Sequence, residues 1–545
     1  MSEQSIERLN SECFCLSLDA DALRLALKSA INQPDLFDLL LQRCPYLFAS
    51  RPVFVSHAHL TRMQKVIHAI ESVVTLPAYR EQVLAYSPLI AHHDPGGARG
   101  VFFSYDFHVT ESSFGLIEIN TNAAGAMLNA VLARAQRACC AALAGLEPPA
   151  LSADGFEQSI MAMFHREWSL SGPARPLRSI AIVDQNPGQQ CLYPEFLLFQ
   201  KLFQRHGLQA VIAGPSEFSL RGGLLWHGDL AIDLVYNRLT DFSLAEQTSE
   251  TLREAYLCNA MVLTPHPQAH ALYADQRNLA LLSDATKLQA LGVPQATQNV
   301  LLAGIPHTEV VEAQHAGRLW CERRLLFFKS FAGVGGRAAY RGDKLTQRVW
   351  QEILAGGYVA QALIAPGGRI VCSQEPLQAL RFDLRNYTYD GSVQWPAARL
   401  YQGQTTQLRT PGTGFTPVYE GPANGQAGWI LKDCVLAQHE SRLFLLDEGA
   451  VQPLERERYV ALARGETALS AFAGQRFILV DWYLRLACGQ AQAVVNETCS
   501  WLVLDAQGLL DVQAAYAIGA EPTPTEAQWT QLRALVFDDT VTKLS

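Results

Sequence analysis

Hydrophobic and polar residues change their spacing several times along the chain, and each change marks an expected element. Over residues 1–95 apolar residues recur three and four positions apart, as in DADALRLALKSAINQ and DLFDLLLQRC, which predicts a mostly helical region. The turn residues of HHDPGGARG (92–100) end this region. VFFSYDFHV and GLIEIN then alternate with a period of two on either side of TESSFG, which predicts a β-hairpin. An Ala-rich helical pattern follows to about residue 143.

A different pattern begins near residue 178. RSIAIVDQ is a continuous apolar run typical of a buried strand, PEFLLFQKLFQRHG is a helical pattern that ends at a glycine, and LQAVIAGP is a second strand. This order predicts a βαβ unit, which LAIDLVYNRLTD extends by a further strand. Residues 278–293 and 344–355 predict helices, and 325–419 is otherwise rich in strands. Short strands and helices alternate after residue 425, so the whole chain predicts a mixed α/β (α+β) fold.

Composition narrows the function classes. The chain has 545 residues, so two or three domains are expected, and 49% hydrophobic with 17% charged residues is typical of a globular protein. The formal net charge of −9 argues against a broad nucleic-acid-binding surface. The 12 cysteines contain no CxxC pair, so we expect no zinc site and separate thiols in a reducing cytoplasm. We see neither a signal-peptide pattern nor a membrane-spanning stretch, and therefore expect a cytoplasmic protein without membrane contact.

Asp106, Glu118 and Asn120 form the first group of candidate functional residues. If the two predicted strands pair, Asp106 lies opposite Glu118, and Asn120 shares the face of Glu118 because side chains alternate along a strand. Carboxylate and amide oxygens are ligands that suit Mg²⁺. The alternative is a hairpin with a polar face in solvent. Ile117 and Ile119 favour buried strands, in which a cation would offset the cost of burying the carboxylates.

FFKSFAGVGGRAAYRG (327–342) contains the second group. Lys329 lies inside an apolar strand, and Gly333, Gly335 and Gly336 follow before the next strand begins. Glycines let backbone N–H groups approach phosphate oxygens, and the lysine adds a positive charge beside them. The pattern differs from the GxxxxGK[ST] phosphate loop. The alternative is an ordinary Gly-rich hairpin loop beside a lysine whose ammonium reaches solvent.

RFDLRNYTYDGSVQWPAARL (381–400) contains the third group. Asp383 and Arg385 share one strand face, a DG turn follows, and Arg399 comes back on the returning strand. Two guanidinium groups in one place would bind an anion, since their planar geometry matches phosphate or carboxylate. The alternative is local ion pairing of surface arginines. The next stretch is rich in Gly, Thr and Pro, includes Arg409, and is typical of an ordered functional loop.

Together these motifs resemble the ATP-grasp superfamily of carboxylate–amine ligases, with the order of the parts changed. FFKSFAGVGGRAAYRG resembles the lysine strand and Gly-rich loop, YVAQALIAP the hinge strand that holds adenine, and FDLRNYTYDGSVQWPAAR the arginine strands. EIN (118–120) resembles the metal strand but lies about two hundred residues upstream instead of downstream. This order is similar to that of eukaryotic-type glutathione synthetase and of the synthetase domain of glutathionylspermidine synthase, which carry an α/β substrate domain between the two halves.

The resemblance implies a circularly permuted ATP-grasp fold with an inserted α/β substrate-binding domain and a helical N-terminal region. The expected parts are the helical region 1–95, the metal-binding part of the core 96–150, the inserted domain 175–265, the lysine, Gly-rich loop, hinge and arginine strands 275–424, and a C-terminal region 425–545 without an indicated role.

The resemblance also implies a role for single residues. Mg²⁺ would be bound by Asp106, Glu118 and Asn120, and the transferred phosphate by the catalytic arginines Arg385 and Arg399. The residues expected to contact ATP are Lys287, Lys329, Gly333, Gly335, Gly336, Gln361 and Leu363, and those expected to contact substrate are Asn122, Arg238 and Arg409. The helix entered through Asn122 would aim its N-terminal N–H groups at the phosphates or at a substrate carboxylate.

The implied activity is the ATP- and Mg²⁺-dependent formation of an amide bond through an acyl phosphate, with small amino acids or peptides as substrates. The partners would be a small carboxylate and a small amine, and a homodimer is one oligomeric state left open. Two alternatives remain, a non-catalytic nucleotide-binding interaction protein and a small-molecule kinase that stops at phosphoryl transfer.

Overall fold

The computed structural model divides the chain into two compact units, residues 1–11 with 16–424 and residues 12–15 with 425–545. The described residues are 3–12, 16–18, 23, 27, 43–138, 153–331, 338–371, 378–406, 408, 410–421, 435–447, 450–453, 476–487, 490–495, 498–504, 510–517, 527 and 530–531. The predicted helices DADALRLALKSAINQ and DLFDLLLQRC lie almost wholly outside these residues.

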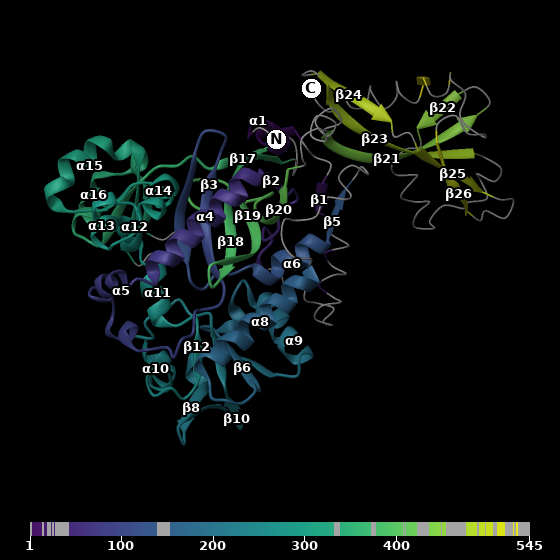
Figure 1. The fold of residues 1–545 in the computed structure, drawn as a ribbon. Helices are drawn as coiled ribbons and strands as arrows, with labels where there is room; N and C mark the ends of the chain where they lie inside the picture. Colours follow the sequence, from purple (N-terminus) through teal and green to yellow (C-terminus); the bar gives the residue numbers. More distant parts are fainter. Residues whose placement is uncertain are drawn as a thin grey trace. The chain divides into compact units, whose positions relative to one another are not determined.

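A central sheet of seven strands carries most of the first unit (Figure 1). Its order is β2 (Val53–Val55), β20 (Gly414–Glu420), β19 (Ser392–Tyr401), β18 (Gln378–Tyr389), β3 (Phe103–Val109) and β4 (Phe114–Asn120), with β17 (Gly367–Val371) also paired to β18. Helix α4 (His57–Val74) packs Val66, Ile67 and Ile70 against apolar side chains of β3, β4 and β18. Helix α4 therefore covers one face of the sheet, while Tyr387, Ala397 and Phe415 on the other face belong to a separate apolar cluster.

The predicted hairpin is confirmed, with one irregularity. β3 and β4 are antiparallel and Asp106 is the register partner of Glu118, but the next pair is Phe107 with Leu116. Ile117 is therefore an extra residue, a β-bulge, and the strict alternation expected for it is wrong. Ile117 is half-buried and lies on the same side as Glu118.

A second, four-stranded antiparallel sheet contains the predicted lysine strand. Its order is β13 (Thr308–Val310), β16 (Tyr358–Ala362), β14 (Leu326–Ser330) and β15 (Ala339–Arg341). Helices α15 (Ala316–Glu322) and α16 (Gln347–Leu354) cover it through Leu319, Trp350 and Ile353. The single helix expected over 278–293 is wrong, because Asp284 caps a new helix, giving α12 (Gln276–Leu282) and α13 (Ala285–Ala290).

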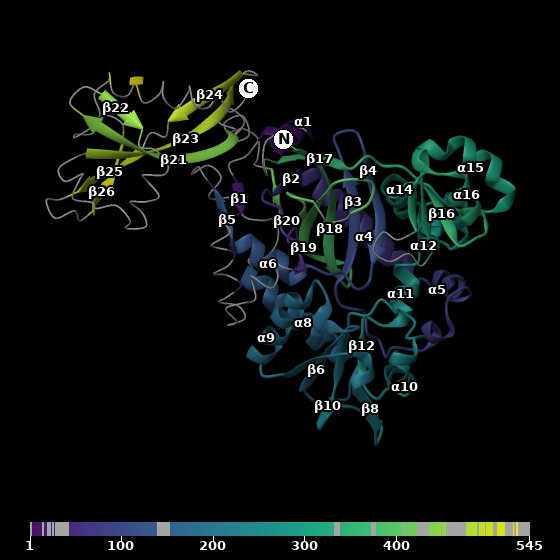
Figure 2. The same cartoon turned by 180° about the vertical axis from the view of Figure 1, so that it is seen from behind.

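The predicted βαβ unit is confirmed as part of a parallel sheet, which lies beside α8 (Ala153–Ser171) in both views (Figures 1 and 2). The order is β12 (Val262–Thr264), β11 (Leu234–Asn237), β6 (Ser179–Val183) and β7 (Gln209–Ala213), and α9 (Tyr193–Arg205) connects the last two. Because β6 leads to β7 on one side and β11 leads to β12 on the other, strand order reverses between β6 and β11. Such a switch point opens a crevice at the carboxyl ends of the strands.

Three smaller features complete the first unit. Next to the parallel sheet lies a small antiparallel sheet of β10 (Leu230–Ile232), β9 (Leu224–His227) and β8 (Phe218–Arg221). Helix α6 (Ala126–Arg134) ends before the expected residue 143, because β5 (Gln136–Ala138) pairs with β1 (Leu16–Leu18). Cys44 and Cys191 form a disulfide with Cα atoms 6.0 Å apart, where the sequence indicated only separate thiols.

The second unit is an antiparallel sheet of six strands within its described residues. The order is β22 (Ala450–Pro453), β21 (Val435–Asp447), β23 (Arg476–Ala487), β25 (Thr498–Leu504) and β26 (Leu510–Ala517), with β24 (Gln490–Val495) also paired to β23. Among the described residues from 435 onward, positions 527, 530 and 531 are helical and the others lie in strands.

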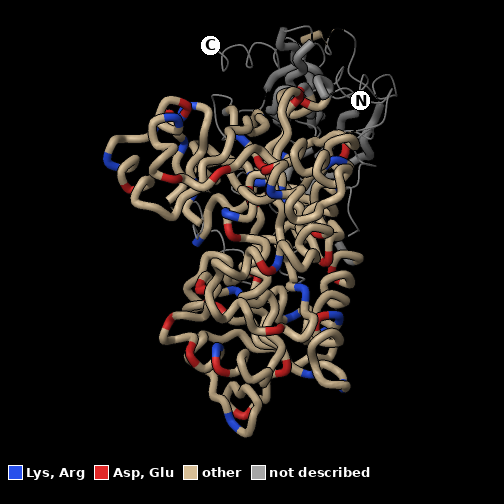
Figure 3. Tube along the Cα trace, turned by 60° about the vertical axis from the view of Figure 1, so that its left-hand side comes forward, with Lys and Arg blue, Asp and Glu red and all other residues tan. Residues whose placement is uncertain are grey.

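Acidic and basic residues are interspersed along the described trace (Figure 3). Within that same part of the chain, no helix combines the length and the apolar character needed to cross a membrane.

Candidate functional site

A cavity of about 410 Å³ is walled by the central sheet, the lysine-bearing sheet and the carboxyl ends of the parallel sheet. Of the described residues that line it, two are acidic, Glu118 and Asp184, and six are basic: Arg238, Lys329, Arg341, Arg381, Arg385 and Arg399. An excess of basic side chains at the wall of a cavity favours an anionic ligand.

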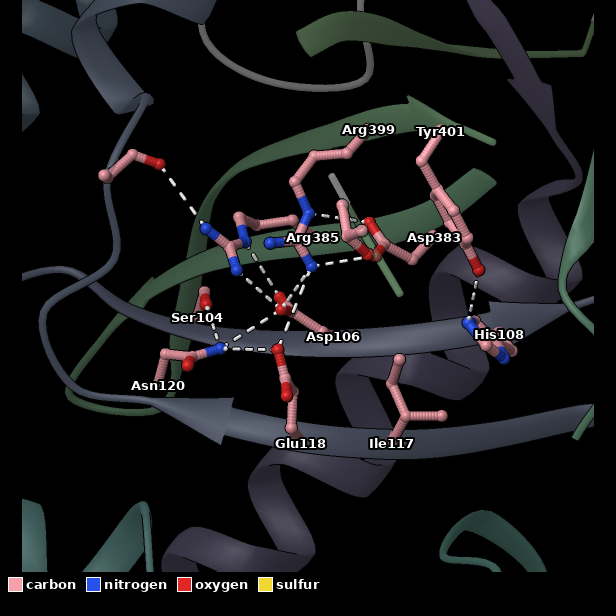
Figure 4. A network of polar contacts seen from close by, with 12 residues as sticks. Ser104, Asp106, His108, Ile117, Glu118, Asn120, Asp383, Arg385, Arg399 and Tyr401 are labelled. Atoms are coloured by element: carbon pink, nitrogen blue, oxygen red, sulfur yellow. Dashed lines mark hydrogen bonds and ion pairs between the residues drawn. The ribbon is translucent and has the colours of Figure 1, made fainter. Parts of the chain in front are cut away.

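Asp106 lies beneath this wall and is held by both predicted arginines (Figure 4). β18 is paired with β3 so that Arg385 is the register partner of Asp106. Arg385 donates from Nε to Oδ1 over 3.0 Å and from Nη2 to Oδ2 over 2.6 Å. Arg399 donates from Nη2 to Oδ2 of the same carboxylate over 2.8 Å. A carboxylate with no exposed surface is thus neutralised by two guanidinium groups.

Arg399 also forms an ion pair with a second carboxylate. Asp383, the register partner of Arg399 across β18 and β19, accepts from Nε and from Nη2, each over 2.8 Å. Asp383 additionally accepts from the Thr406 hydroxyl over 2.6 Å, which ties the loop after β19 to the cluster. The sequence expectation of two arginines in one place is therefore met, but each arginine already has a buried carboxylate as its partner.

The two acids of the hairpin have opposite electrostatic environments. Burial raises the pKa of Asp106, but the charges of Arg385 and Arg399 outweigh burial and hold that pKa below its usual range. Burial and then the neighbouring Asp106 carboxylate raise the pKa of Glu118. Glu118 is 33% exposed, and Asn120 donates from Nδ2 to both acids, over 3.1 Å to Asp106 and 3.3 Å to Glu118.

Glu118 and Asn120 are therefore the members of the predicted metal set that reach the cavity. Among the described residues no group of three or more His, Cys, Asp or Glu side chains is arranged to hold a metal ion. One carboxylate and one carboxamide still fit Mg²⁺, which completes its coordination with phosphate and water oxygens.

Lys329 links the four-stranded sheet, to which it belongs, to the central sheet at the cavity. Its ammonium donates to the backbone oxygen of Ile117, at the bulge that breaks the β3–β4 register, and to Oε1 of Gln361 over 2.9 Å. Gln361 in turn donates from Nε2 to the Thr308 hydroxyl over 3.2 Å. Burial lowers the pKa of Lys329, against the opposing effect of the Glu118 and Asp106 carboxylates.

At the switch point of the parallel sheet, Asp184 follows β6 and Arg238 follows β11, and both line the cavity. Burial raises the pKa of Asp184 to about 6, although Arg238 opposes this. The family resemblance indicates Arg238, whereas no motif singled out in the sequence includes Asp184. An acid directly after a buried strand of a βαβ unit was the signal available for it.

Asn122, which the resemblance assigned to substrate, lines the cavity and is also bonded to the parallel sheet. Arg238 donates from Nη1 to the backbone oxygens of Asn122 and Ala123, each over 2.9 Å, and Asn122 donates from Nδ2 to the oxygen of Leu239 over 3.1 Å. These bonds tie the connection between β4 and α6 to the parallel sheet.

The N-terminus of α6, expected to face a ligand, contacts a carboxylate of the protein itself. The buried carboxylate of Glu195 accepts from the backbone N–H of Gly125 over 2.9 Å and from that of Met127 over 3.2 Å. A carboxylate from α9 thus satisfies two backbone donors at this helix terminus and places a negative charge at the positive end of the helix dipole.

The remaining predicted residues fall into three groups. Lys287 does not line the cavity; its ammonium pairs with Asp284 at 3.5 Å. Leu363 and Gln361 do line it, but the backbone N–H of Leu363 donates to Leu325 over 2.9 Å. The three glycines of the predicted phosphate loop and the loop arginine lie outside the described residues: Gly333, Gly335, Gly336 and Arg409.

No protein-family model and no curated protein matches the sequence. Among solved structures, a glutathione synthetase-like effector (GSS30) from Globodera pallida has a TM-score of 0.46 and 9% identity over 74% of this chain and 98% of its own. A putative gamma-glutamylcysteine synthetase from Methylobacillus flagellatus KT has a TM-score of 0.40 and 10% identity, over 70% and 95%. The ATP-grasp ligase PsnB with a minimal precursor has a TM-score of 0.26 and 13% identity, over 44% and 90%. With TM-scores this low, the functional conclusion rests on the geometry of the site.

Proposed function

We propose that the protein is an ATP- and Mg²⁺-dependent carboxylate–amine ligase with a circularly permuted ATP-grasp core. One observation carries this: Glu118 on β4, Lys329 on β14 and the arginine pair on β18 and β19 line a single cavity. These groups come from segments about two hundred residues apart, in the order that the family resemblance predicts for a permuted chain.

The net positive charge of the side chains that line the cavity suits a nucleoside triphosphate. The basic side chains at its wall exceed the acidic ones, and the hydrogen bonds of Lys329 and Arg385 hold them in fixed positions. Glu118 and Asn120 would hold Mg²⁺, which when bound neutralises phosphate charge that the protein's own cations leave uncompensated. Asp106 would bind Mg²⁺, as predicted, only after Arg385 and Arg399 exchange its carboxylate for the phosphate oxygens.

The residues that line the cavity would contribute to the reaction as follows. A substrate carboxylate oxygen attacks the terminal phosphorus and ADP leaves. An amine then displaces the phosphate from the acyl carbon, and the proton that the amine loses goes to the departing phosphate. Lys329, Arg385 and Arg399 compensate the charge that moves between these oxygens. Asp184 and Arg238, at the strand ends facing the same cavity, would orient the acid and the amine.

A non-catalytic nucleotide-binding protein is the second candidate, and one observation favours it. Arg385 and Arg399 are paired with Asp106 and Asp383, so their charges are compensated inside the protein. A site that only stores a nucleotide has no need to release these arginines.

The decisive experiment measures ADP release with a panel of small carboxylates and amines. We expect amine-dependent ADP release and an amide product from the wild-type chain, and neither from Glu118→Gln at unchanged unfolding free energy. The matched control is Glu111→Gln, an exposed glutamate at the turn of the same hairpin, which should retain full activity. Wild-type turnover in Glu118→Gln contradicts the metal role. ATP binding without turnover identifies the binding protein, and a phosphorylated product without an amide identifies a kinase.

A further inference from the structure

Two stacked rings form a part of the cavity wall to which the proposed reaction assigns no role. Phe242 lies in the segment after β11, and His270 lies on α11 (Pro267–Tyr273); both side chains line the cavity and both residues are partly exposed. Their ring centroids are 3.6 Å apart, with an angle of 9° between the ring planes. Ala274, one turn of helix after His270, also lines the cavity. This part of the wall offers a flat and mostly apolar surface to a ligand.

The ring pair borders the part of the cavity assigned to the substrate. Thr121 directly follows Asn120, the proposed magnesium ligand at the end of β4, and the Thr121 hydroxyl contacts Nδ1 of His270 over 3.1 Å. The next residue, Asn122, accepts from Arg238 through its backbone oxygen over 2.9 Å. His270 and Arg238 are thus bonded to two consecutive residues of the connection between β4 and α6.

The hydrogen bond to Thr121 determines which nitrogen of His270 carries the proton. Desolvation lowers the pKa of His270 to about 3, so the ring is neutral near neutral pH and has one N–H group. The Thr121 hydroxyl is buried, and Nδ1 of His270 is its one partner in the described part of the chain. A buried hydroxyl normally donates a hydrogen bond, so Thr121 donates to Nδ1 and the ring proton is on Nε2.

The Nε2–H group of His270 is available to a ligand. It has no hydrogen-bond partner among the described residues, and it is not one of the fully buried polar atoms there. Because His270 lines the cavity, its accessible surface belongs to the cavity wall. This donor carries no formal charge, unlike the six basic side chains of the same wall. It therefore suits an uncharged oxygen, since charged oxygens form stronger hydrogen bonds with the guanidinium and ammonium groups.

We infer that the acid substrate is an N-acylated amino acid with an apolar side chain, whose amide oxygen accepts from Nε2 of His270 and whose side chain packs on Phe242. A ligase needs a carboxylate, and this wall adds an uncharged acceptor and an apolar group to the requirement. The carboxyl-terminal residue of a peptide belongs to the same chemical class. The inference rests on the proposed ligase activity, because it names the acid of that reaction.

The experiment is a calorimetric titration of the full chain with N-acetyl-L-phenylalanine and with hydrocinnamate, which has the same ring and carboxylate but no amide. We expect the wild-type chain to bind N-acetyl-L-phenylalanine about twofold to tenfold more tightly than hydrocinnamate, the effect of one hydrogen bond to an uncharged donor. N-acetylglycine, which keeps the amide but has no side chain, should bind more weakly than N-acetyl-L-phenylalanine. Equal affinity for N-acetyl-L-phenylalanine and either of the other two ligands, or no binding of N-acetyl-L-phenylalanine, overturns the inference.

Two variants locate the contacts. His270→Phe keeps a ring against Phe242 but has no donor, so it should bind N-acetyl-L-phenylalanine and hydrocinnamate equally. Phe242→Ala should weaken both ligands to a similar extent, because both lose the apolar contact. The control is His227→Phe, which changes a second Phe–His ring contact, with Phe218 outside this cavity, and should keep the wild-type preference.

A preference for the amide that persists in His270→Phe, or unchanged affinities in Phe242→Ala, overturns the inference. The preference is a ratio of two affinities in one protein, so a partial loss of stability does not imitate its loss, and the wild-type comparison decides where a variant does not fold. The titrations contain no ATP and are therefore separate from the test of the ligase. The preference without amine-dependent ADP release overturns the ligase and keeps the binding site, whereas ADP release without the preference overturns only the roles of His270 and Phe242.

Discussion

Arg385 and Asp106 face each other on adjacent strands and form two parallel hydrogen bonds of 3.0 and 2.6 Å. This bidentate pair has almost no contact with solvent, since Arg385 is 6% exposed and Asp106 is fully buried. Asp106, which the resemblance assigned to Mg²⁺, thus pairs with Arg385 and Arg399, which the resemblance assigned to the transferred phosphate. Breaking a buried pair by removing one partner is costly because the other charge stays buried.

Asp106→Asn should lower the free energy of unfolding by about 3–5 kcal/mol, because Arg385 and Arg399 both lose their shared counter-charge. Urea denaturation measures the change. Glu352→Gln is the control, since its partner Arg348 is exposed and the loss should stay below about 0.5 kcal/mol. A change in Asp106→Asn as small as in the control would show that the pair does not stabilise the fold.

Gly125→Ala should destabilise the start of α6. Gly125 has φ +96°, and a Cβ there would lie 2.6 Å from the Phe415 ring. Left-handed strain and the clash together should cost about 3 kcal/mol. In contrast, Gly317→Ala in α15 meets open space and should stabilise by about 0.5–1 kcal/mol. Chemical denaturation of both variants checks the pair, and opposite signs are the expected result.

Local pattern was sufficient for the elements that surround the site. The hairpin, the lysine strand and the βαβ unit each follow from a period or an apolar run, and the structure has all three. The break at Asp284 was also visible in the sequence, because Ser-Asp before a helical run is an N-cap signal. The bulge at Ile117 was not, since a period of two cannot reveal a one-residue insertion before the partner strand is known.

The pairing of charges could not be predicted from one sequence. Arg385 and Asp106 are 279 residues apart, and Glu195 is 70 residues from the N–H group of Gly125 that it accepts from. The residue type alone says only that each of these two side chains is a carboxylate; it does not identify the group that pairs with it. Only the register of distant strands decides whether a buried acid meets a cation from the protein or one from solution.

Asp184 should give a specific pH dependence of stability. Its pKa is raised by burial to about 6, against about 3.9 in an unfolded chain, so the folded state keeps a proton that the unfolded state has lost. Wild-type stability should therefore fall relative to Asp184→Asn as pH rises from about 4 to about 6, and the difference should stay constant above that. Denaturation at a series of pH values tests this. Asp229→Asn, on the exposed turn between β9 and β10, serves as the matched control for the loss of a carboxylate.

Gln361 should act as a positioning residue for Lys329. Its Oε1 accepts from the lysine ammonium over 2.9 Å, and its Nε2 is fixed by Thr308, so the amide selects one orientation of the ammonium. Gln361→Leu removes the acceptor and should slow ADP formation by about 10- to 100-fold, as expected for a misplaced charge. It should also lower the pKa of Lys329 further, which moves the alkaline limb of the pH–rate profile to lower pH. Gln361→Glu keeps an acceptor and should move that limb the other way.

The matched control for Gln361 is Gln298→Leu, a buried glutamine that donates to Val293 over 2.8 Å outside the cavity. Both leucine variants lose a buried amide and its hydrogen bonds, so both should lose comparable stability. Only Gln361→Leu should change the pH–rate profile, because only its amide contacts the lysine. Identical profiles for the two variants would mean that Lys329 is held by the Ile117 carbonyl alone, and that the bulge rather than the glutamine sets the position of the ammonium.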